Sequence, residues 1–491
     1  MKKIIVLLLC CIMILSLVFT LYSCNSGDTG GKTGSGGENN SAGDNIADDT
    51  PEDAENPDDR NSITDNLPDM NFEKYDFRIF NSSDFSDRLY AGAENGDVIN
   101  DAFYKANKTV EDRFNINISI IESVYDSSEK AMKAAIKSGD DAFDLAFGHD
   151  YGTGAASLEG LFVDIHTLNY LDYSKPWWPN NTVDSLTIKG KMFVFSNSIT
   201  TLGLDWTRLL YINKGTAKDM GVEVPYKDVF DGTWTLDKLI NITRDIYTDL
   251  NGDGKRDRDD KYGYAFTGPF YCSIEPFGVQ VVHKTADGFE INVMNERTQK
   301  IVDMMYELIV NSPGTFYYRN EEQLSEKLFL NGNAFILHKY LQDARLTFRA
   351  SDIDYGILPF PKLDENQESY YAGYHDRLFA VPVTAQDLDR AAIIIEAMSA
   401  EGWKKVFPAY YEISMKNKFL ADEESIKILD LIYSVRVLDF AYIYSIKYYM
   451  MLDDLLSGSK PSADLSSYYE KSVGAVQKAL DKIEEEFDNI G

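Results

Sequence analysis

Strand and helix patterns alternate through residues 75–147, and this alternation constrains the fold more than any other feature of the sequence. In chain order, the segments are a strand at 75–80, a helix at 100–114, a strand at 116–120, a helix at 127–138 and a strand at 143–147. Phe103, Val110 and Phe114 recur at helical spacing, whereas isoleucines alternate with polar residues in the strand that follows. The βαβαβ order predicts an α/β fold with a mostly parallel sheet and right-handed crossovers.

The carboxyl edge of this predicted sheet is a candidate ligand site, because open α/β sheets bind ligands beyond the carboxyl ends of their strands. Polar residues follow two of the three strands there. They are Asn81, Ser82 and Ser83 after the first strand, and His149, Asp150 and Tyr151 after the third. We expect Asp150 to accept hydrogen bonds from ligand hydroxyls, with His149 beside it.

The N-terminus has the features of a secretory signal peptide over residues 1–23. Two lysines precede an apolar run, and small residues precede the expected cleavage point. The run ends in Leu21-Tyr22-Ser23-Cys24, which resembles a bacterial lipobox. The resemblance implies that Cys24 is acylated, for example with palmitate, and anchors the protein at the extracytoplasmic face of the cell membrane. An uncleaved transmembrane helix is the alternative, because the run approaches the roughly 20 residues that a bilayer requires.

Residues 24–70 are predicted to be a disordered acidic linker. They consist mainly of Gly, Ser, Asn, Asp and Glu, with only Lys32 and Arg60 as cations, so they bury too little apolar surface to offset the entropy of folding. The roughly 420 residues that follow exceed the usual size of one hydrophobic core, which favours two lobes.

Charge argues against one class of partner, and cysteine content argues against internal disulfides. The chain has 79 acidic residues against 48 Lys plus Arg and a formal charge of −31, which argues against a nucleic-acid partner. Cys10 and Cys11 leave with the signal, Cys24 takes lipid, and Cys272 stands alone. The mature chain is therefore expected to form no internal disulfide.

Four further segments resemble sequence motifs of one protein family. They are Lys175-Pro176-Trp177-Trp178, Tyr211-Ile212-Asn213-Lys214, Gly-Thr-Trp-Thr-Leu-Asp-Lys-Leu at 232–239 and Asp-Tyr-Gly-Ile-Leu-Pro-Phe-Pro at 354–361. They follow His149-Asp150 and the segment 155–165 in the family's order. On these residues the chain resembles the bacterial extracellular solute-binding proteins, the maltose-binding-protein-like receptors of carbohydrate ABC transporters. The resemblance extends through most of the mature chain.

The resemblance implies a two-lobed periplasmic-binding-protein fold of type II, whose lobes close about a hinge on a ligand between them. It implies an N-terminal lobe made of residues 71–200 and 377–405, and a C-terminal lobe made of 201–376 and 406–491. It also implies a monomer that works with ABC permease subunits and performs no covalent chemistry.

An acidic loop over 249–260 resembles a calcium-binding EF-hand loop. Calcium takes about six to eight oxygen ligands, which such a loop supplies from regularly spaced positions around a Gly. The matching residues are Asp249, Asn251, Asp253, Lys255 through its carbonyl, Asp257 and Asp260, with Gly254 at the turn. Asp260 stands where Glu is usual. We expect a structural calcium ion here, with an acidic turn that binds nothing as the alternative.

Sugar recognition indicates which other residues belong in a cleft. Aromatic rings stack on the apolar face of a pyranose, while carboxylates and amides bond its hydroxyls. The candidates from other segments are Trp177, Trp178, Trp206, Tyr340, Tyr374 and His375. Trp234 is assigned to the core, because it begins an amphipathic helix.

The sequence thus predicts a lipid-anchored receptor that binds a sugar, most simply an oligosaccharide, and delivers it to an ABC importer. A ligand-sensing or adhesive surface lipoprotein of the same fold is one alternative. A secreted glycan-active enzyme is another, although the sequence has no Gly-x-Ser-x-Gly elbow, His-Glu-x-x-His helix or Walker loop.

Overall fold

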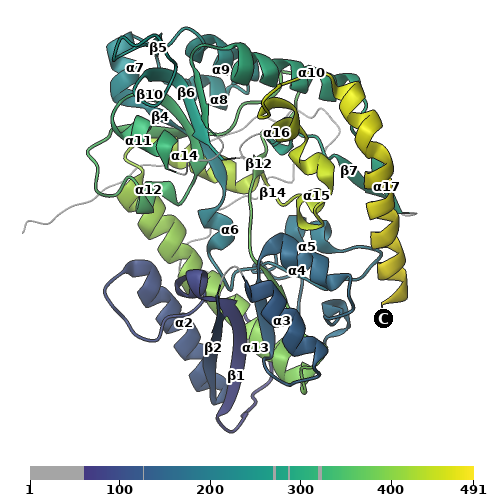
Figure 1. Cartoon of the computed structure of the whole chain (residues 1–491). Helices are drawn as coiled ribbons and strands as arrows, with labels where there is room; N and C mark the ends of the chain where they lie inside the picture. The colour runs from purple at the N-terminus through teal and green to yellow at the C-terminus, as the bar shows by residue number, and fades with distance from the viewer. Residues whose placement is uncertain (1–59, 125–126, 269–272, 286–287, 319–322, 491) are drawn as a thin grey trace, which may run out of the picture. The chain divides into compact units, whose positions relative to one another are not determined.

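The computed structural model describes residues 60–490 except 125–126, 269–272, 286–287 and 319–322 (Figure 1). Every described residue belongs to one compact unit of the chain. The predicted signal peptide, Cys24, Cys272 and most of the predicted linker therefore lie outside the described residues. Within the described part, no helix is both long and apolar enough to cross a membrane.

The first sheet has the strand order β13-β3-β1-β2. Its strands are β1 (Tyr75–Ser82), β2 (Ile116–Ser123), β3 (Leu145–Gly148) and β13 (Leu378–Ala380). β1 pairs in parallel with β2 and with β3, whereas β13 pairs antiparallel with β3. Helices α2 (Val98–Phe114) and α3 (Ser128–Lys137) form the crossovers, which confirms the predicted βαβαβ unit.

The second sheet has the order β11-β4-β10-β6-β5, and β9 also pairs with β6. Its strands are β4 (Arg208–Asn213), β5 (Tyr247–Thr248), β6 (Lys261–Thr267), β9 (Thr315–Tyr318), β10 (Ala334–Tyr340) and β11 (Tyr355–Leu358). β6 runs parallel to β9 and β10, while β4 runs antiparallel to β10 and β11. β4 is buried along its whole length, although its apolar centre is bounded by Arg208 and Asn213.

Two pairs of short strands stand apart from these sheets. β7 (Val282–Thr285) and β8 (Gly288–Ile291) form an antiparallel hairpin, and β12 (Ala372–Gly373) pairs in parallel with β14 (Arg436–Val437). Because β13 belongs to the first sheet and follows β11 of the second, the chain passes from the first sheet to the second and back. The lobe boundaries at 200/201, 376/377 and 405/406 stay a prediction.

Helices cover the sheets and connect the strands. The remaining α-helices are α4 (Asp150–Ser157), α5 (Asn180–Leu186), α6 (Leu202–Asp205), α7 (Lys214–Met220), α8 (Tyr226–Phe230), α9 (Leu236–Thr243), α10 (Glu296–Tyr306), α11 (Leu324–Leu330), α12 (Asp343–Leu346), α13 (Leu388–Glu401), α14 (Glu423–Ser434), α15 (Phe440–Ile443), α16 (Met451–Leu456) and α17 (Leu465–Asn489). The 3₁₀ segments are η1 (Ser83–Arg88), η3 (Ile165–Thr167), η5 (Glu275–Phe277) and η9 (Lys447–Met450), and the π-helical segments are η6 (Glu307–Asn311), η7 (Gly402–Val406) and η8 (Ala409–Phe419).

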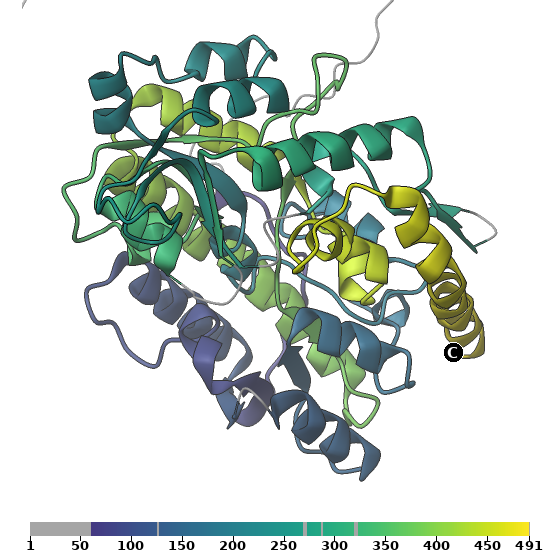
Figure 2. The same cartoon turned by 45° about the horizontal axis from the view of Figure 1, so that its top comes forward.

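The C-terminal helix α17 is amphipathic, as its sequence pattern predicts. Val476, Leu480, Ile483 and Phe487 are buried at three- and four-residue spacing. In both views α17 runs past the β7–β8 hairpin (Figures 1 and 2). The backbone N–H of Phe289 in that hairpin donates to Glu484 Oε1 across 3.0 Å, which joins the helix to the hairpin.

The first strand is longer than its sequence pattern indicates. β1 continues to Ser82, so Asn81 and Ser82 lie inside the strand and only Ser83 follows it. The prediction ended at Phe80 because the apolar residues stop there, but pairing with β2 continues to the match of Ser82 with Ser123. The assignment of Trp234 to the core is confirmed, since it is 0% exposed and its indole N–H donates to the Pro359 carbonyl.

Candidate functional site

Asp150 lies at the carboxyl edge of the first sheet. It is the first residue of α4, directly after β3 and His149, and it is 1% exposed. His149 Nδ1 lies 2.6 Å from Asp150 Oδ1, and Asp150 Oδ2 lies 3.8 Å from His375 Nδ1. Tyr442 also bonds to the Asp150 carboxyl. A carboxylate has about four lone-pair sites, so Asp150 retains acceptor capacity for a ligand.

Aromatic rings from the C-terminal part of the chain surround His375. The Tyr442 ring centroid lies 4.2 Å from that of His375 in an edge arrangement, and Tyr442 lies 4.7 Å from Tyr449. The Tyr449 hydroxyl lies 3.5 Å from His375 Nε2. Tyr340, at the carboxyl end of β10, is 6.3 Å from His375 and T-shaped to it. The end of a second-sheet strand therefore meets the end of a first-sheet strand through His375.

A buried ion pair adjoins these rings. Arg208, the first residue of β4, places its Nη2 3.2 Å from Glu275 Oε1, and both side chains are 3% exposed. The same nitrogen donates to the Tyr449 hydroxyl across 2.8 Å, and Nη1 donates to Ser273. The contacts connect seven residues, which we call the Asp150 network: His149, Asp150, Arg208, Glu275, His375, Tyr442 and Tyr449.

Burial sets the protonation of several groups in and beside this network. It lowers the pKa of His375 well below the ordinary value, and the charges of Arg208 and His149 lower it further. His375 is therefore neutral at pH 7 and offers one donor and one acceptor nitrogen. Burial also raises the pKa of Asp439 to about 7, with a contribution from Glu275. Asp439 is the N-cap of α15 and accepts from the Ala441 N–H across 2.6 Å.

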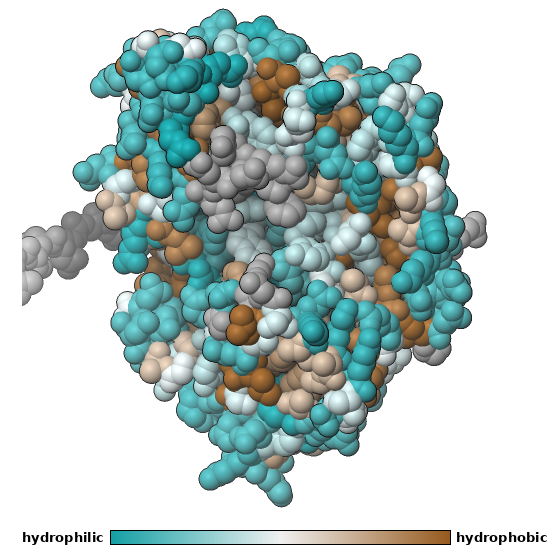
Figure 3. All heavy atoms as spheres, viewed as in Figure 1, coloured by the Kyte–Doolittle hydropathy of each residue, from teal (hydrophilic) through white to brown (hydrophobic). Residues whose placement is uncertain are grey.

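An exposed tyrosine packs against the network at the protein surface. Tyr151 is 42% exposed, and its ring centroid lies 4.0 Å from that of His149 and 6.4 Å from that of Tyr442. The face drawn in Figure 3 is hollowed near its middle. Hydroxyl, imidazole and carboxylate groups beside aromatic rings are the combination that binds a polyhydroxylated ring with one apolar face.

The structure brings together five of the residues predicted to bind ligand: His149, Asp150, Tyr151, Tyr340 and His375. Three others lie elsewhere. Asn81 is 0% exposed and donates to the Ser86 hydroxyl, Trp206 packs against Phe85 at 5.3 Å, and the Tyr374 hydroxyl bonds to Thr182 across 2.8 Å. The side chain of Ser82 lies outside the described residues.

Trp177 and Trp178 belong to the core rather than to a ligand surface, which corrects the sequence prediction. They are 0% and 1% exposed, and their indole N–H groups donate to Glu396 Oε1 and Oε2, each across 2.8 Å. The ring of Trp178 packs against Phe195 at 5.4 Å. The only polar atom of each side chain is thus hydrogen-bonded inside the protein. The sequence prediction placed these tryptophans on a ligand surface, but the carboxyl group of Glu396 on α13 accepts a hydrogen bond from each of them.

Four residues of the network escaped the sequence prediction: Arg208, Glu275, Tyr442 and Tyr449. Arg208 carries a weak signal, because a cation that opens a wholly buried strand requires a partner or a function. Glu275 lies in a short 3₁₀ segment with no recognisable motif. Tyr442 and Tyr449 belong to a segment rich in tyrosine, in which nothing distinguishes the residues that reach the site from those that fill the core.

The predicted calcium loop connects β5 to β6, so two strands flank it where an EF-hand has helices. Asp249 accepts from the N–H groups of Gly252 and Gly254 across 2.7 and 2.8 Å. Gly252 and Gly254 have φ of 75° and 74°, a conformation that favours glycine. The loop therefore turns around its first carboxylate.

The last predicted ligand, Asp260, points inward. It is 0% exposed and accepts from the Leu250 N–H across 3.2 Å and from the Tyr247 hydroxyl across 3.1 Å. Across the described residues, no group of three or more His, Cys, Asp or Glu side chains is placed to hold a metal ion. The donor types suit calcium, but in this conformation Asp249 and Asp260 accept with both carboxylate oxygens, and Asn251 with its amide oxygen, from N–H and O–H groups of the loop and its flanks.

Solved structures share this fold. The GacH receptor of Streptomyces glaucescens GLA.O superposes with a TM-score of 0.56 and 14% identity, covering 83% of this chain and 99% of its own. UgpB from Mycobacterium tuberculosis, in complex with glycerophosphocholine, gives 0.54 and 14%, covering 83% and 98%. Maltose-bound MalE3 from T. maritima gives 0.52 and 13%, covering 82% and 100%. At these identities the likeness establishes the fold, a two-lobed solute-binding α/β fold.

The sequence comparison identifies the family. No curated protein matches the sequence significantly. The profile of the bacterial extracellular solute-binding proteins matches residues 101–415, which is more than half of the chain and includes most of the first sheet, the whole second sheet and five residues of the Asp150 network. The chain belongs to the bacterial extracellular solute-binding protein family.

Proposed function

We propose that this protein is a receptor that binds an oligosaccharide at the Asp150 network and delivers it to an ABC importer. The observation that carries the proposal is the position of Asp150, a buried carboxylate at the carboxyl edge of the first sheet that faces His375 and Tyr442 from distant segments of the chain. Family membership supports capture of a solute outside the cytoplasm.

The chemistry of the network suits a sugar. Asp150 accepts hydrogen bonds from hydroxyls, neutral His375 can donate or accept them, and Tyr442 and the adjoining Tyr340 present rings to apolar C–H faces. Among the structural neighbours, GacH is described with acarbose and MalE3 with maltose. UgpB is described with glycerophosphocholine, which shows that the fold also accepts solutes that are not saccharides.

The proposal includes the anchor at Cys24, the structural calcium ion and the absence of covalent chemistry on the ligand. The residue types at 21–24 support acylation, and export suits a chain whose family works outside the cytoplasm. The loop at 249–260 supports calcium binding through its ligand spacing and its turn around Asp249.

A thermal-shift panel tests the function. The purified mature chain is heated with malto-, cello-, xylo- and manno-oligosaccharides, followed by product analysis of each mixture. A ligand that binds only the native state raises the melting temperature with concentration, so we expect a saturating shift for one class and no product. Turnover of any sugar would indicate an enzyme, and a panel without shifts would contradict oligosaccharide binding.

A further inference from the structure

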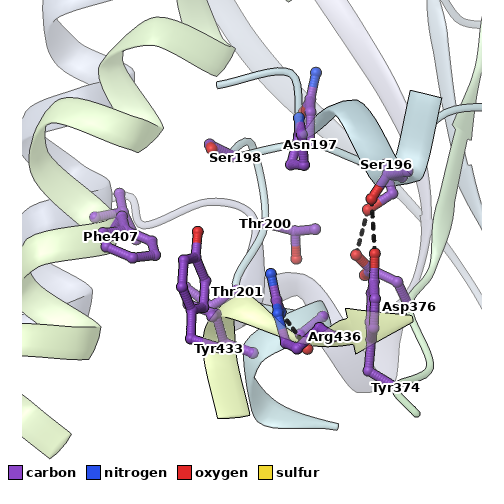
Figure 4. Close-up of a pocket in the computed structure, with 15 residues that line it drawn as sticks. Ser196, Asn197, Ser198, Thr200, Thr201, Tyr374, Asp376, Phe407, Tyr433 and Arg436 are labelled. Atoms are coloured by element: carbon purple, nitrogen blue, oxygen red, sulfur yellow. Dashed lines mark hydrogen bonds between the residues drawn. The ribbon is translucent and has the colours of Figure 1, made fainter. Parts of the chain in front are cut away.

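A second polar site lies where the chain passes between the two sheets. A cavity of about 40 Å³ is lined by segment 196–204, which leads into β4, by Tyr374 and Asp376, which lead into β13, and by residues of the α13–η8 and α14–β14 regions. Figure 4 shows Thr200, Tyr433 and Arg436 around its centre, with Ser196 bonded to Asp376 at one side. It does not include the Asp150 network.

Polar atoms line this cavity without protein partners. Thr201 is 2% exposed, and its Oγ1 has no hydrogen-bond partner among the described residues. The same holds for Nε of Arg436, whose Nη1 donates to the Gly203 carbonyl across 3.0 Å. Leaving a buried hydroxyl and a guanidinium N–H unbonded costs free energy, so a built site requires a partner for them.

The size of the cavity and its polar lining limit which molecules can occupy it. A cavity needs roughly 10 to 15 Å³ to hold one water, and a sugar ring requires far more than the space present here. Thr182, Tyr374 and Tyr433 add hydroxyls, and the carboxyl of Asp376 lies at the wall. Burial raises the pKa of Asp376 to about 7, as expected for a carboxyl with few bulk-water contacts.

We propose that this cavity is a built water site, in which ordered water bonds to Thr201 Oγ1 and Arg436 Nε between the segments that link the two sheets. The water completes the hydrogen bonding of these segments and supplements the direct bonds of Ser196 to Asp376 and of Arg436 to Gly203. The inference goes beyond the proposed function, because it concerns the link between the sheets and not the solute site.

Thr201→Val tests the water site through the sign of its effect. Valine keeps the shape of threonine and removes the hydroxyl. If water satisfies Thr201, the variant loses a bonded group and its melting temperature falls, on the order of 2 °C for a domain of this kind. Thr153→Val is the matched control, because Thr153 is 1% exposed and its Oγ1 also lacks a protein partner, but it does not line this cavity.

The expected result is a lower melting temperature for Thr201→Val than for both the parent chain and Thr153→Val. An unchanged or higher melting temperature for Thr201→Val would overturn the proposal, because removal of a dry, unbonded hydroxyl stabilises a protein. A crystal structure of the full mature chain supplies the second measurement. Density for water within about 3.2 Å of Thr201 Oγ1 is expected, and its absence would also overturn the proposal.

Discussion

Arg88 donates its Nε hydrogen to Asp205 Oδ2 across 2.9 Å, and this bond joins the segment after β1 to helix α6. Asp205 is 0% exposed and also accepts from Arg345 of α12 and from the Tyr410 hydroxyl of η8. One carboxylate thus holds four segments that are distant in sequence. Since two guanidinium groups share this acid, loss of its charge leaves Arg345 without its anionic partner and Arg88 with only the exposed Asp87.

Asp205→Asn should therefore destabilise the protein strongly. Breaking a buried pair by removing one partner costs about 3 to 5 kcal/mol, and we expect the lower end because the two arginines are 16% and 13% exposed. Urea unfolding gives the free energy directly. Asp87→Asn is the control, since Asp87 also pairs with Arg88 but is 68% exposed, and such pairs contribute little. Equal effects of both variants would contradict the account.

Glu396 should make stability depend on pH. Burial raises its pKa from 4.5 to about 7, although the Trp178 and Trp177 N–H groups oppose the rise. The folded protein then keeps a proton that the unfolded chain releases, so this group's contribution to stability is full below about pH 4.5 and is lost as pH rises to about 7. Urea unfolding at pH 5, 6 and 7 should show a smaller fall for Glu396→Gln than for the parent. Parallel pH profiles would refute this role.

The loop at 249–260 should bind calcium and stabilise the fold. Calcium binds the folded chain in preference to the unfolded one, so it should raise the melting temperature and a chelator should lower it reversibly. Asp249→Ala should abolish the shift. Asp259→Ala should retain it, because Asp259 is exposed in the same loop but stands outside the ligand spacing. A melting temperature that changes with neither calcium nor chelator would contradict calcium binding.

Cys24 should be the cysteine that carries the acyl groups. The mass of the mature N-terminal peptide from the native host should include fatty acyl groups on Cys24. Cys24→Ser should eliminate that mass, whereas Cys11→Ser should not, since Cys11 lies in the apolar run of the signal. An unmodified Cys24, or acyl groups that persist in Cys24→Ser, would refute the anchor.

The local part of this fold could be predicted from sequence, and the distant pairings could not. The βαβαβ unit follows from hydrophobic period, because consecutive elements pair with each other. β13 could not be predicted in this way, because its three residues follow the strands of the second sheet in sequence and yet pair with β3 of the first sheet. The hydrophobic periodicity of a segment indicates which of its residues are buried, but not which distant strand the segment pairs with.

The same division applies to the site. Asp150 was predicted because its position after β3 follows from the local sheet, whereas its neighbours His375 and Tyr442 come from distant segments of the chain. Arg208 and Glu275 come from separate elements, and only tertiary packing shows that they pair. Trp177 shows the opposite error, because an aromatic residue that suits a sugar also suits a core, and only the position of Glu396 decides between them.

Titration calorimetry of Asp150→Ala tests the central claim most directly. The ligand is the oligosaccharide that gives the largest thermal shift, and Asp112→Ala is the control, since Asp112 is 67% exposed on α2. Loss of a buried acceptor should weaken binding by about 1 to 3 kcal/mol, while the control binds like the parent. Undiminished affinity in Asp150→Ala, with the fold intact, would show that the solute binds elsewhere.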